Sequence, residues 1–177
     1  MLNRMSMVRK EREVMTKQAT DQLKLARTQG FHLEALRKFT LSDDQMRYTS
    51  LPMPAFETCM KDPERHPVVI LSGERVVGFF VLHSGEGAKE YTSNKNAMLL
   101  RALSIDQKEQ GKGYGKHAMF LVKDYVKSNF PEIDEVVLAV NVKNGVARSI
   151  YLEQGYVDLG KKKEGRSGPM SILHLFL

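Results

Sequence analysis

The sequence predicts a single mixed α+β domain in which a mostly antiparallel central sheet is flanked by helices. Three observations predict it: β-rich runs recur along most of the chain, two of them flank a short turn typical of a hairpin, and segments of helical periodicity separate the others. A chain of 177 residues can bury about two-thirds of the surface that it exposes when unfolded, so one domain suffices. We expect a helical extension at residues 1–18, the domain at residues 19–177, and the element order βααβββαβαββ.

The first half of the chain predicts a strand, a helix, a long connection and a hairpin. Residues 3–17 fit either a short amphipathic helix or a frayed arm, because their apolar positions are only loosely periodic. Leucines alternate with charged residues in "DQLKLARTQ", which indicates a strand, and "FHLEALRKF" indicates a helix. Residues 40–66 predict one or two short helices in a connection of the kind that often lines binding sites. "PVVILSGERVVGFFVLHSG" predicts a hairpin with its turn at residues 73–74.

The second half begins with a strand, a glycine-rich loop and a helix. "NAMLLRALSI" predicts a strand that leads into "QGKGYGKH", after which apolar residues repeat at helical spacing until Asn129, Phe130 and Pro131 end the helix. "DEVVLAVNV" predicts a further strand, and "NGVARSIYLEQ" predicts a helix that ends at Gly155. "YVDLGKKK" and "MSILHLFL" predict two closing strands.

Composition limits the class of protein. Cys59 is the single cysteine, which excludes an internal disulfide and a zinc site of paired cysteines, and is typical of a reducing cytoplasm. The longest apolar run, around residues 76–82, is far shorter than the roughly 20 residues that a membrane span needs. The opening "MLNRMSMVRKEREVM" is charged throughout and lacks the apolar core of a signal peptide. We therefore expect a cytoplasmic protein with no membrane partner and no metal.

The net charge of +6 and the pI of about 9.4 favour anionic partners. The basic residues are scattered apart from one run at residues 161–163, and no basic stripe interleaved with aromatic side chains is present. We therefore predict a small anionic ligand and no nucleic-acid partner.

The glycine-rich loop is the candidate anion site. It carries three glycines and two lysines: Gly111, Gly113, Gly115, Lys112 and Lys116. The glycines permit a close approach of the backbone, and a helix N-terminus offers free N–H groups to a phosphate. A nucleotide-binding P-loop needs one more residue before the lysine and a hydroxyl where His117 stands, and a dinucleotide fingerprint needs its third glycine one residue later. A pyrophosphate site without a metal fits the pattern, and a glycine-rich turn that only packs the helix on the sheet is the alternative.

Two segments resemble one known family. Residues 110–115 match the Q/R-x-x-G-x-G/A signature of the GNAT superfamily of acetyl-CoA-dependent N-acetyltransferases. "NGVARSIYLEQGYV" resembles the second signature of that family through Asn144, Ala147, Tyr151, Gly155 and Tyr156. The resemblance covers residues 20–177, and it implies a GNAT-like fold whose sheet is splayed open at the acetyl-CoA site.

The resemblance also implies where the co-substrate acetyl-CoA binds. Its pantetheine arm would enter between the strand that ends near Ile105 and the strand that ends near Asn141, and its amides would pair with the backbone of Leu103, Ser104 and Ile105. The diphosphate would bind the loop residues Gln110, Gly111, Lys112, Gly113, Tyr114, Gly115 and Lys116. Asn144 and Tyr151 would contact the arm from the other side, although Asn144 is equally typical of a helix N-cap.

The family's usual mechanism is direct attack of a primary amine on the thioester in a ternary complex. Tyr151 matches the general acid, because a phenol with a pKa near 10 stays protonated at neutral pH. Packing of the ring on the sheet is the alternative role for Tyr151. Some members carry a glutamate as base in the strand before the loop, and Leu99 stands there in this chain. Candidates for the base are His83, Glu57, His66 or a chain of waters.

The amine acceptor is the expected second substrate, and the family signatures do not cover the segments that would select it, residues 40–66 and the closing strands. Small-molecule amines and peptides are both open, whereas Arg101 and the basic balance of the chain argue against a polyamine. Monomer and homodimer are both open as well. The alternative function is a non-catalytic sensor or scaffold that binds acetyl-CoA or CoA.

Overall fold

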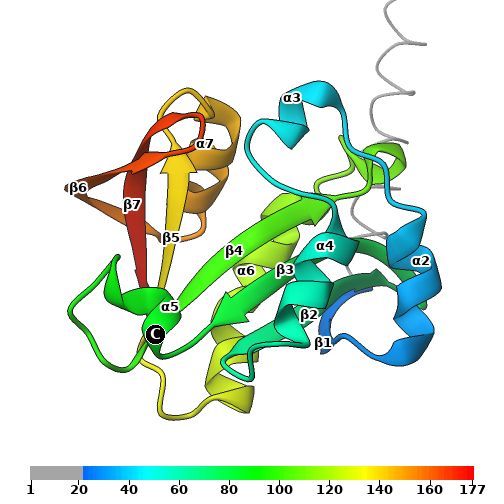
Figure 1. Ribbon diagram of the computed structural model, residues 1–177, viewed down its shortest axis with the longest axis horizontal. Coiled ribbons are helices and arrows are strands. Elements are labelled where there is room, and N and C mark those ends of the chain that lie inside the picture. Colours follow the sequence, from blue (N-terminus) through cyan, green and yellow to red (C-terminus); the bar gives the residue numbers. More distant parts are fainter. Residues whose placement is uncertain (1–21) are drawn as a thin grey trace, which may run out of the picture.

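The structure, a computed structural model, describes residues 22–177. These residues form a seven-stranded sheet with the strand order β1-β2-β3-β4-β5-β7-β6 (Figure 1). All neighbouring strands are antiparallel except β4 and β5, which are parallel. The predicted mixed α+β class with a mostly antiparallel sheet is therefore confirmed.

The elements follow one another in the predicted order, with additional short helices. The strands are β1 (Leu23–Arg27), β2 (Arg65–Ser72), β3 (Arg75–His83), β4 (Ala97–Ile105), β5 (Glu135–Asn141), β6 (Val157–Gly165) and β7 (Gly168–Phe176). The α-helices are α2 (Leu33–Arg37), α3 (Asp43–Met46), α4 (Pro52–Cys59), α5 (Glu86–Lys89), α6 (Tyr114–Asn129) and α7 (Gly145–Glu153). Two 3₁₀-helices, η1 (Gly30–His32) and η2 (Gln107–Glu109), complete the set.

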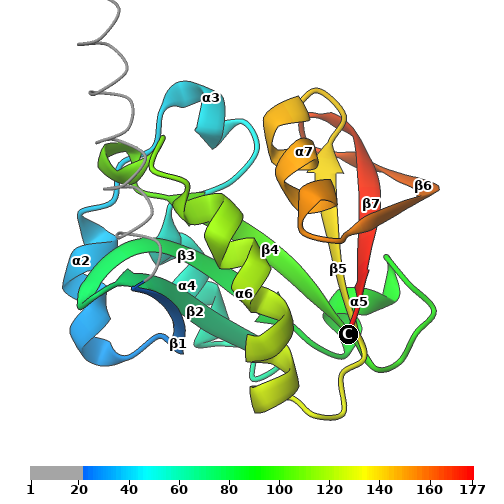
Figure 2. The same cartoon turned by 180° about the vertical axis from the view of Figure 1, so that it is seen from behind.

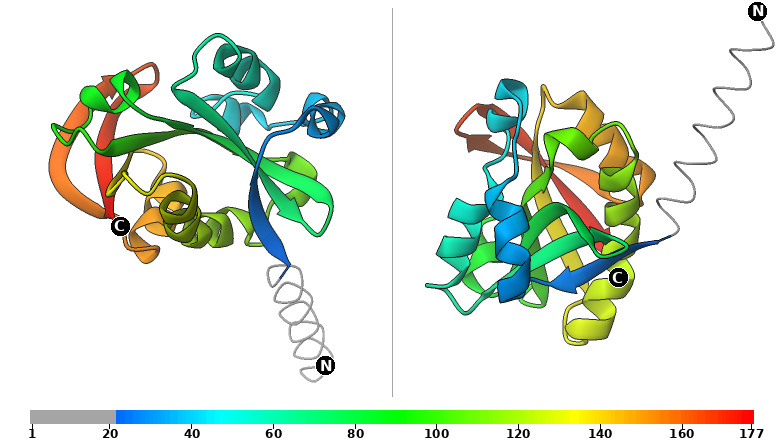
Figure 3. Two further views of the ribbon diagram at one scale, coloured as in Figure 1. Left: turned by 90° about the horizontal axis from the view of Figure 1, so that it is seen from below. Right: turned by 90° about the vertical axis from the view of Figure 1, so that its right-hand side faces the viewer.

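Helices cover both faces of the sheet. Figure 2 shows α6 and α7 across one face, and the left panel of Figure 3 shows α2 and α4 on the opposite side. The strands between these layers are apolar without alternation, because both of their faces are buried; in β3 the run 77–82 is buried throughout. Ala118, Met119, Val122 and Val126 form the buried stripe of α6 at the spacing of one helix face.

The sheet opens between β4 and β5. The two strands pair only between residues 97–99 and residues 135–137. Beyond this short contact β4 continues along β3 to Ile105, while β5 continues along β7 to Asn141, so the two strands diverge (Figure 1). The expected splay is therefore present, and it leaves one edge of each strand unpaired with the other.

A buried polar pair lies at the closed end of the splay. His174 Nδ1 and Glu135 Oε1 are 2.6 Å apart, and both side chains are buried. Thr92 Oγ1 donates to the other oxygen of Glu135 at 3.1 Å. These contacts join β5, β7 and the segment before β4 at the point from which the strands separate.

A β-bulge lies in β4 within the open part. The register shifts between Val81 opposite Arg101 and Phe79 opposite Ser104, so β4 has one residue more than β3 there. Ala102 has a φ of 54°, the only positive φ of a non-glycine residue among residues 22–177. Backbone strain of this kind concentrates at functional sites, and the bulge changes which side chains of β4 face each layer.

Several details differ from the sequence-based expectations. The helix expected at residues 31–39 divides into η1 and α2, and α5 was not predicted, because a four-residue helix carries no measurable periodicity. The connection of residues 40–66, where one or two short helices were expected, contains the two helices α3 and α4. The expected extension at residues 1–18 lies outside the described residues.

No helix in the part of the chain from residue 22 onward is both long enough and apolar enough to cross a membrane.

Candidate active site

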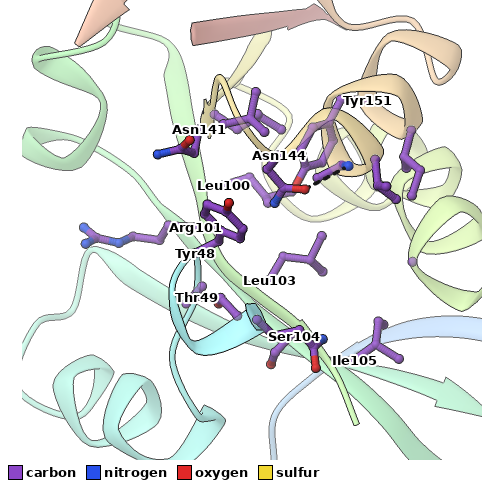
Figure 4. A pocket seen from close by; sticks show the side chains of 18 of the residues that line it. Tyr48, Thr49, Leu100, Arg101, Leu103, Ser104, Ile105, Asn141, Asn144 and Tyr151 are labelled. Atoms are coloured by element: carbon purple, nitrogen blue, oxygen red, sulfur yellow. Dashed lines mark hydrogen bonds between the residues drawn. The ribbon is translucent and has the colours of Figure 1, made fainter. Parts of the chain in front are cut away.

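The opening between β4 and β5 holds a cavity of about 890 Å³ (Figure 4). Residues 99–105 of β4 and residues 138–141 of β5 form its two sides. The glycine-rich loop, the first turn of α6 and the inner face of α7 contribute further walls, and so do parts of the α3–α4 connection and of the β6–β7 turn. The cavity therefore combines most of the predicted site residues with parts of the two segments expected to select the acceptor, residues 40–66 and the closing strands.

The loop adopts a backbone conformation that requires glycine. Gly111 has a φ of 73° and Gly113 a φ of 79°, in the left-handed region that other residues rarely adopt. Gly113 is the N-cap of α6, and the first backbone hydrogen bond of the helix runs from His117 N to Gly113 O at 3.0 Å. The N–H groups of residues 114–116 consequently lack intrahelical acceptors. A 16-residue helix that begins at the cavity therefore offers free donors and the positive end of its dipole to an anion.

The polar side chains of the loop are partly used by the protein itself. Gln110 Nε2 donates to Ile105 O at 2.9 Å and so holds the loop to the end of β4. Lys116 Nζ is 2.5 Å from Glu153 Oε2 of α7, at the rim of the cavity. Lys112 Nζ lies 2.8 Å from Glu109 Oε2 and does not line the cavity, so the structure does not bring Lys112 to the predicted diphosphate position.

Tyr114 and Ser104 line the cavity, but their hydroxyl groups are buried. Tyr114 is 2% exposed, and its hydroxyl lies 3.3 Å from Ser72 Oγ inside the domain. The hydroxyl of Ser104 is buried and has no hydrogen-bond partner within residues 22–177. Leu103 and Ile105 pack against the core layer under α6. The open edge of β4 therefore presents its backbone to the cavity, as pairing with an extended amide-containing ligand requires.

This geometry agrees with one family of proteins. The family model described as "Acetyltransferase (GNAT) family" matches residues 33–156. The chain belongs to the GNAT acetyltransferases. Acetyl-CoA is the co-substrate of this family, and the residues present fit it: a loop of free N–H groups for the diphosphate, an open strand edge for the arm, and unfilled space next to Gly111, where a Cβ would meet no atom within 4 Å.

Comparisons with known proteins support the assignment. The chain is 43% identical over 147 residues to the uncharacterized N-acetyltransferase YbbJ of Bacillus subtilis strain 168. This alignment covers 82% of this chain and 92% of the relative. The spermidine N-acetyltransferase of Vibrio cholerae, crystallised with CoA and spermine, superposes with a TM-score of 0.67 at 19% identity, over 88% of this chain and 96% of that chain. The aminoglycoside acetyltransferase AAC(6')-Ib, crystallised with acetyl-CoA, superposes with a TM-score of 0.69 at 15% identity, over 87% and 93%.

Asn144 occupies the N-cap of α7 in this GNAT domain. Its Oδ1 accepts a hydrogen bond from Ala147 N at 3.2 Å, as the N-cap alternative predicted. Asn144 also lines the cavity, beside Tyr151 (Figure 4). Its contact with the cofactor arm stays a prediction.

Tyr151 lies on the inner face of α7 and reaches toward β4 (Figure 4). It lines the cavity, is 8% exposed, and packs edge-on against Tyr156 with ring centroids 5.6 Å apart. Burial raises the pKa of Tyr151 to about 12. The hydroxyl therefore keeps its proton throughout the neutral range and can act only as a hydrogen-bond donor or acid there.

The candidate bases named from the sequence do not line the cavity. His83 is buried beside Asp62, with 3.3 Å between His83 Nε2 and Asp62 Oδ2, and burial followed by nearby Arg65 lowers its pKa. His66 packs against Phe130, and Glu57 is exposed on α4. Leu99 does line the cavity and is buried, so an apolar side chain stands at the family's glutamate position.

Two hydrogen bonds cross the open end of the gap between β4 and β5, and we call them the bridge. They were not predicted from the sequence. Arg166 Nη2 donates to Met46 O at 3.0 Å, and Ser167 Oγ donates to Arg47 O at 2.7 Å. These bonds join the β6–β7 turn to the end of α3, so the cavity is bounded at both ends of the gap. The acceptors are main-chain carbonyl groups 120 residues away, and no side-chain motif marks such partners in a sequence.

Proposed function

We propose that the chain transfers the acetyl group of acetyl-CoA to a primary amine, which attacks the thioester directly inside the cavity. The spermidine and aminoglycoside N-acetyltransferases, whose fold the chain shares, act on amines according to their names. The single observation that carries the proposal is the splay of β4 from β5, with free loop N–H groups at one end and a buried tyrosine hydroxyl beside the gap.

The proposed binding mode assigns each part of acetyl-CoA to a different part of the cavity. Backbone N–H groups of the loop and of the first turn of α6 hold the diphosphate, since glycines at residues 111 and 113 keep side chains away from it. The backbone of residues 103–105 pairs with the amides of the arm, and Asn144 contacts the arm from α7. Lys116 adds charge at the rim, where Glu153 orients it.

The proposed chemistry forms one bond, breaks one bond, and transfers a proton at the nitrogen and at the sulfur. A bond forms between the amine nitrogen and the carbonyl carbon as the bond between this carbon and sulfur breaks. The nitrogen loses a proton to water, Tyr151 supplies a proton to the departing sulfur, and Tyr151 then regains a proton from water. The burial that raises the pKa of Tyr151 keeps its hydroxyl protonated as a donor to the sulfur, and the same dry environment raises the basicity of the departing thiolate.

Water carries the amine proton away in this proposal. The carboxylates that line the cavity are Asp44 and Glu109. Asp44 is paired with Arg47 at 3.5 Å, and Glu109 is paired with both Arg75 and Lys112, so neither is available as a base. A bound amine with an ordinary pKa loses its proton to solvent more readily as the pH rises, and turnover should rise with it.

Release of CoA measured with a broad panel of amines tests the proposal. We expect steady-state turnover with at least one acceptor, and a mass increase of that acceptor by one acetyl group. Acetyl-CoA binding without release of CoA to any acceptor would favour the alternative, a non-catalytic sensor or scaffold, for which the apolar Leu99 is the supporting observation. The cytoplasmic location and the possibility of a homodimer stay predictions.

Acetyl-CoA itself is expected to stabilise the folded chain. A ligand that binds only the folded state at 100 times its Kd adds about 2.7 kcal/mol to the free energy of unfolding. Thermal unfolding with and without acetyl-CoA measures the effect. An unchanged Tm at millimolar acetyl-CoA would contradict the binding site.

A further inference from the structure

The charged side chains that line the cavity are mostly cationic. They comprise four cations, Arg47, Arg101, Lys116 and Arg166, and the two carboxylates Asp44 and Glu109. Both carboxylates are in ion pairs, and Lys116 is paired with Glu153 at the diphosphate end. Arg166 bonds a main-chain carbonyl in the bridge. The side chain of Arg101 forms neither an ion pair nor a hydrogen bond with any residue among residues 22–177.

Arg101 extends from β4 away from Tyr151 and Asn144 (Figure 4). It directly precedes the bulge residue Ala102, and the preceding odd-numbered residue, Leu99, belongs to the small cluster under α5. The proposed acetyl-CoA site faces the layer of α6 and α7. Arg101 therefore lies on the side of the gap from which the acceptor can approach.

Arg101 carries a charge that the protein does not balance. No carboxylate within residues 22–177 lies within 4.0 Å of its guanidinium group, and it has no hydrogen-bond partner there. Burial followed by nearby Arg65 lowers the pKa of Arg101. Arg101 is exposed in the cavity lining, so its guanidinium is open to an anion from solution, and the nearby positive charge of Arg65 favours such an anion.

Asp62, a carboxylate whose charge acts on Arg101, is already engaged, and so is Glu64 beside it. Asp62 accepts a hydrogen bond from Arg65 Nε at 2.9 Å and lies 3.3 Å from His83 Nε2, and the bond from Arg65 keeps the pKa of Asp62 below its usual value. Glu64 accepts a hydrogen bond from Glu86 N at 3.1 Å. No carboxylate among residues 22–177 forms an ion pair with Arg101, so its guanidinium is free to bind a ligand carboxylate.

We propose that Arg101 binds a carboxylate of the acceptor, so that the substrate class is amines that carry a carboxylate, such as amino acids or peptides with a nearby acidic group. The inference rests on the proposed function. A planar guanidinium binds a carboxylate through two parallel hydrogen bonds, which fixes the distance between that carboxylate and the reacting nitrogen. A polyamine or aminoglycoside, with several positive charges and no carboxylate, is repelled by the same residue.

Matched acceptors that differ only at the carboxylate test the inference. The series lysine, lysinamide and cadaverine, the pair β-alanine and β-alaninamide, and the pair glycylglycine and its amide cover several distances between amine and carboxylate. For the wild type we expect kcat/KM at least about tenfold higher for the carboxylated member of an accepted series, as for a hydrogen-bonded charge pair. Equal or better use of the members without a carboxylate would overturn the inference and leave the acetyl transfer intact.

Substitutions of Arg101 provide a second test of the inference. Arg101→Gln should raise KM for the carboxylated acceptor about tenfold, leave kcat within about twofold, and abolish the preference over the amide. Arg101→Lys should recover part of the preference, since it restores the charge without the paired geometry. The control is Arg37→Gln, which removes the same charge from an exposed position at the end of α2, outside the cavity lining. A preference unchanged in Arg101→Gln would refute the role.

Calorimetric titration of the CoA-loaded protein with the same acceptors separates failure of the inference from failure of the proposed function. Tight binding of carboxylated members to the wild type but not to Arg101→Gln, without turnover, would support the inference and contradict the enzyme assignment. The stabilisation by acetyl-CoA should be the same in Arg101→Gln as in the wild type, which shows that the donor site is intact. Tighter binding of O-phosphoethanolamine than of every carboxylated amine would show that the site prefers a phosphate group to a carboxylate. That result would overturn the inference.

Discussion

Replacement of Tyr151 by phenylalanine is expected to lower kcat about 100-fold while acetyl-CoA binding and stability change little. The substitution keeps the ring and its edge-on contact with Tyr156 but removes the hydroxyl that faces the cavity. Loss of a positioned general acid typically costs on the order of 10²-fold to 10⁴-fold, and CoA is a moderately good leaving group, so the lower end is expected. Single-turnover rates with the best acceptor measure the chemical step.

Tyr156→Phe is the matched control. The Tyr156 hydroxyl is buried, does not line the cavity, and has no hydrogen-bond partner within residues 22–177. Its removal should leave kcat near the wild-type value and leave stability unchanged or slightly higher, because an unsatisfied buried hydroxyl is itself unfavourable. Wild-type single-turnover rates in Tyr151→Phe across pH 6 to 9 would exclude the general acid. Equal losses in both variants would attribute the effect to packing.

The pKa of Tyr151 gives the direction of the pH dependence. Burial raises this pKa to about 12, so the acid stays protonated at pH 6 to 9 and cannot cause a loss of activity in that range. Between the unfolded value near 10 and the folded value near 12, the unfolded chain has lost this proton and the folded chain has kept it. Stability from this group is therefore complete below pH 10 and decreases as the pH rises toward 12.

Gly113→Val is expected to weaken CoA binding at least about tenfold. Gly113 combines a φ of 79° with the N-cap position of α6, where a branched side chain would stand among the free N–H groups. Loss of hydrogen bonds to a charged group costs about 1.5–3 kcal/mol, and 1.4 kcal/mol corresponds to a factor of ten. Calorimetric titration with CoA measures the change.

Backbone strain complicates this substitution, and two controls separate it from the loss of binding. Gly160 in β6 has a φ of 81°, lies outside the cavity lining, and has open space where a side chain would stand. Gly160→Val should therefore lose a similar amount of stability and keep normal CoA affinity. Gly115→Ala should also bind CoA, because its Cβ would meet Ile105 Cγ1 at an ordinary 3.7 Å. Normal affinity in folded Gly113→Val would refute the phosphate site.

The local features of the donor site could be predicted from the sequence. Gln110 and the loop glycines occupy consecutive positions, and their conformations follow from short-range sterics at a strand-to-helix turn. The seven strands and their order along the chain were also predictable, because apolar β-branched runs and turns are local signals.

The segments of the proposed acceptor side, residues 40–66 and the closing strands, were expected from the sequence. The contacts that join them could not be predicted, because they link distant parts of the chain. The bridge joins Arg166 and Ser167 to main-chain carbonyls near α3, which carry no residue-specific signal. The ion pair of Lys112 with Glu109 could not be predicted either, and the contact of Lys112 with the diphosphate stays a prediction. The lack of a counter-ion for Arg101 could not be predicted either. It depends on the pairing of Asp62 with Arg65 in the folded chain.

The gap between β4 and β5 is bounded at both of its ends, by the short pairing of residues 97–99 with residues 135–137 and by the bridge from Arg166 to Met46. In the proposed binding mode the two reactants use separate sides of this gap. Acetyl-CoA would bind on the side of α6 and α7, and the acceptor on the side of Arg101. Substitutions in the α3–α4 connection and in the β6–β7 turn can therefore change the proposed acceptor side. They leave the loop and α7, on the proposed acetyl-CoA side, unchanged. Relatives that share the loop and α7 can consequently diverge in the amines they accept while keeping one acetyl donor.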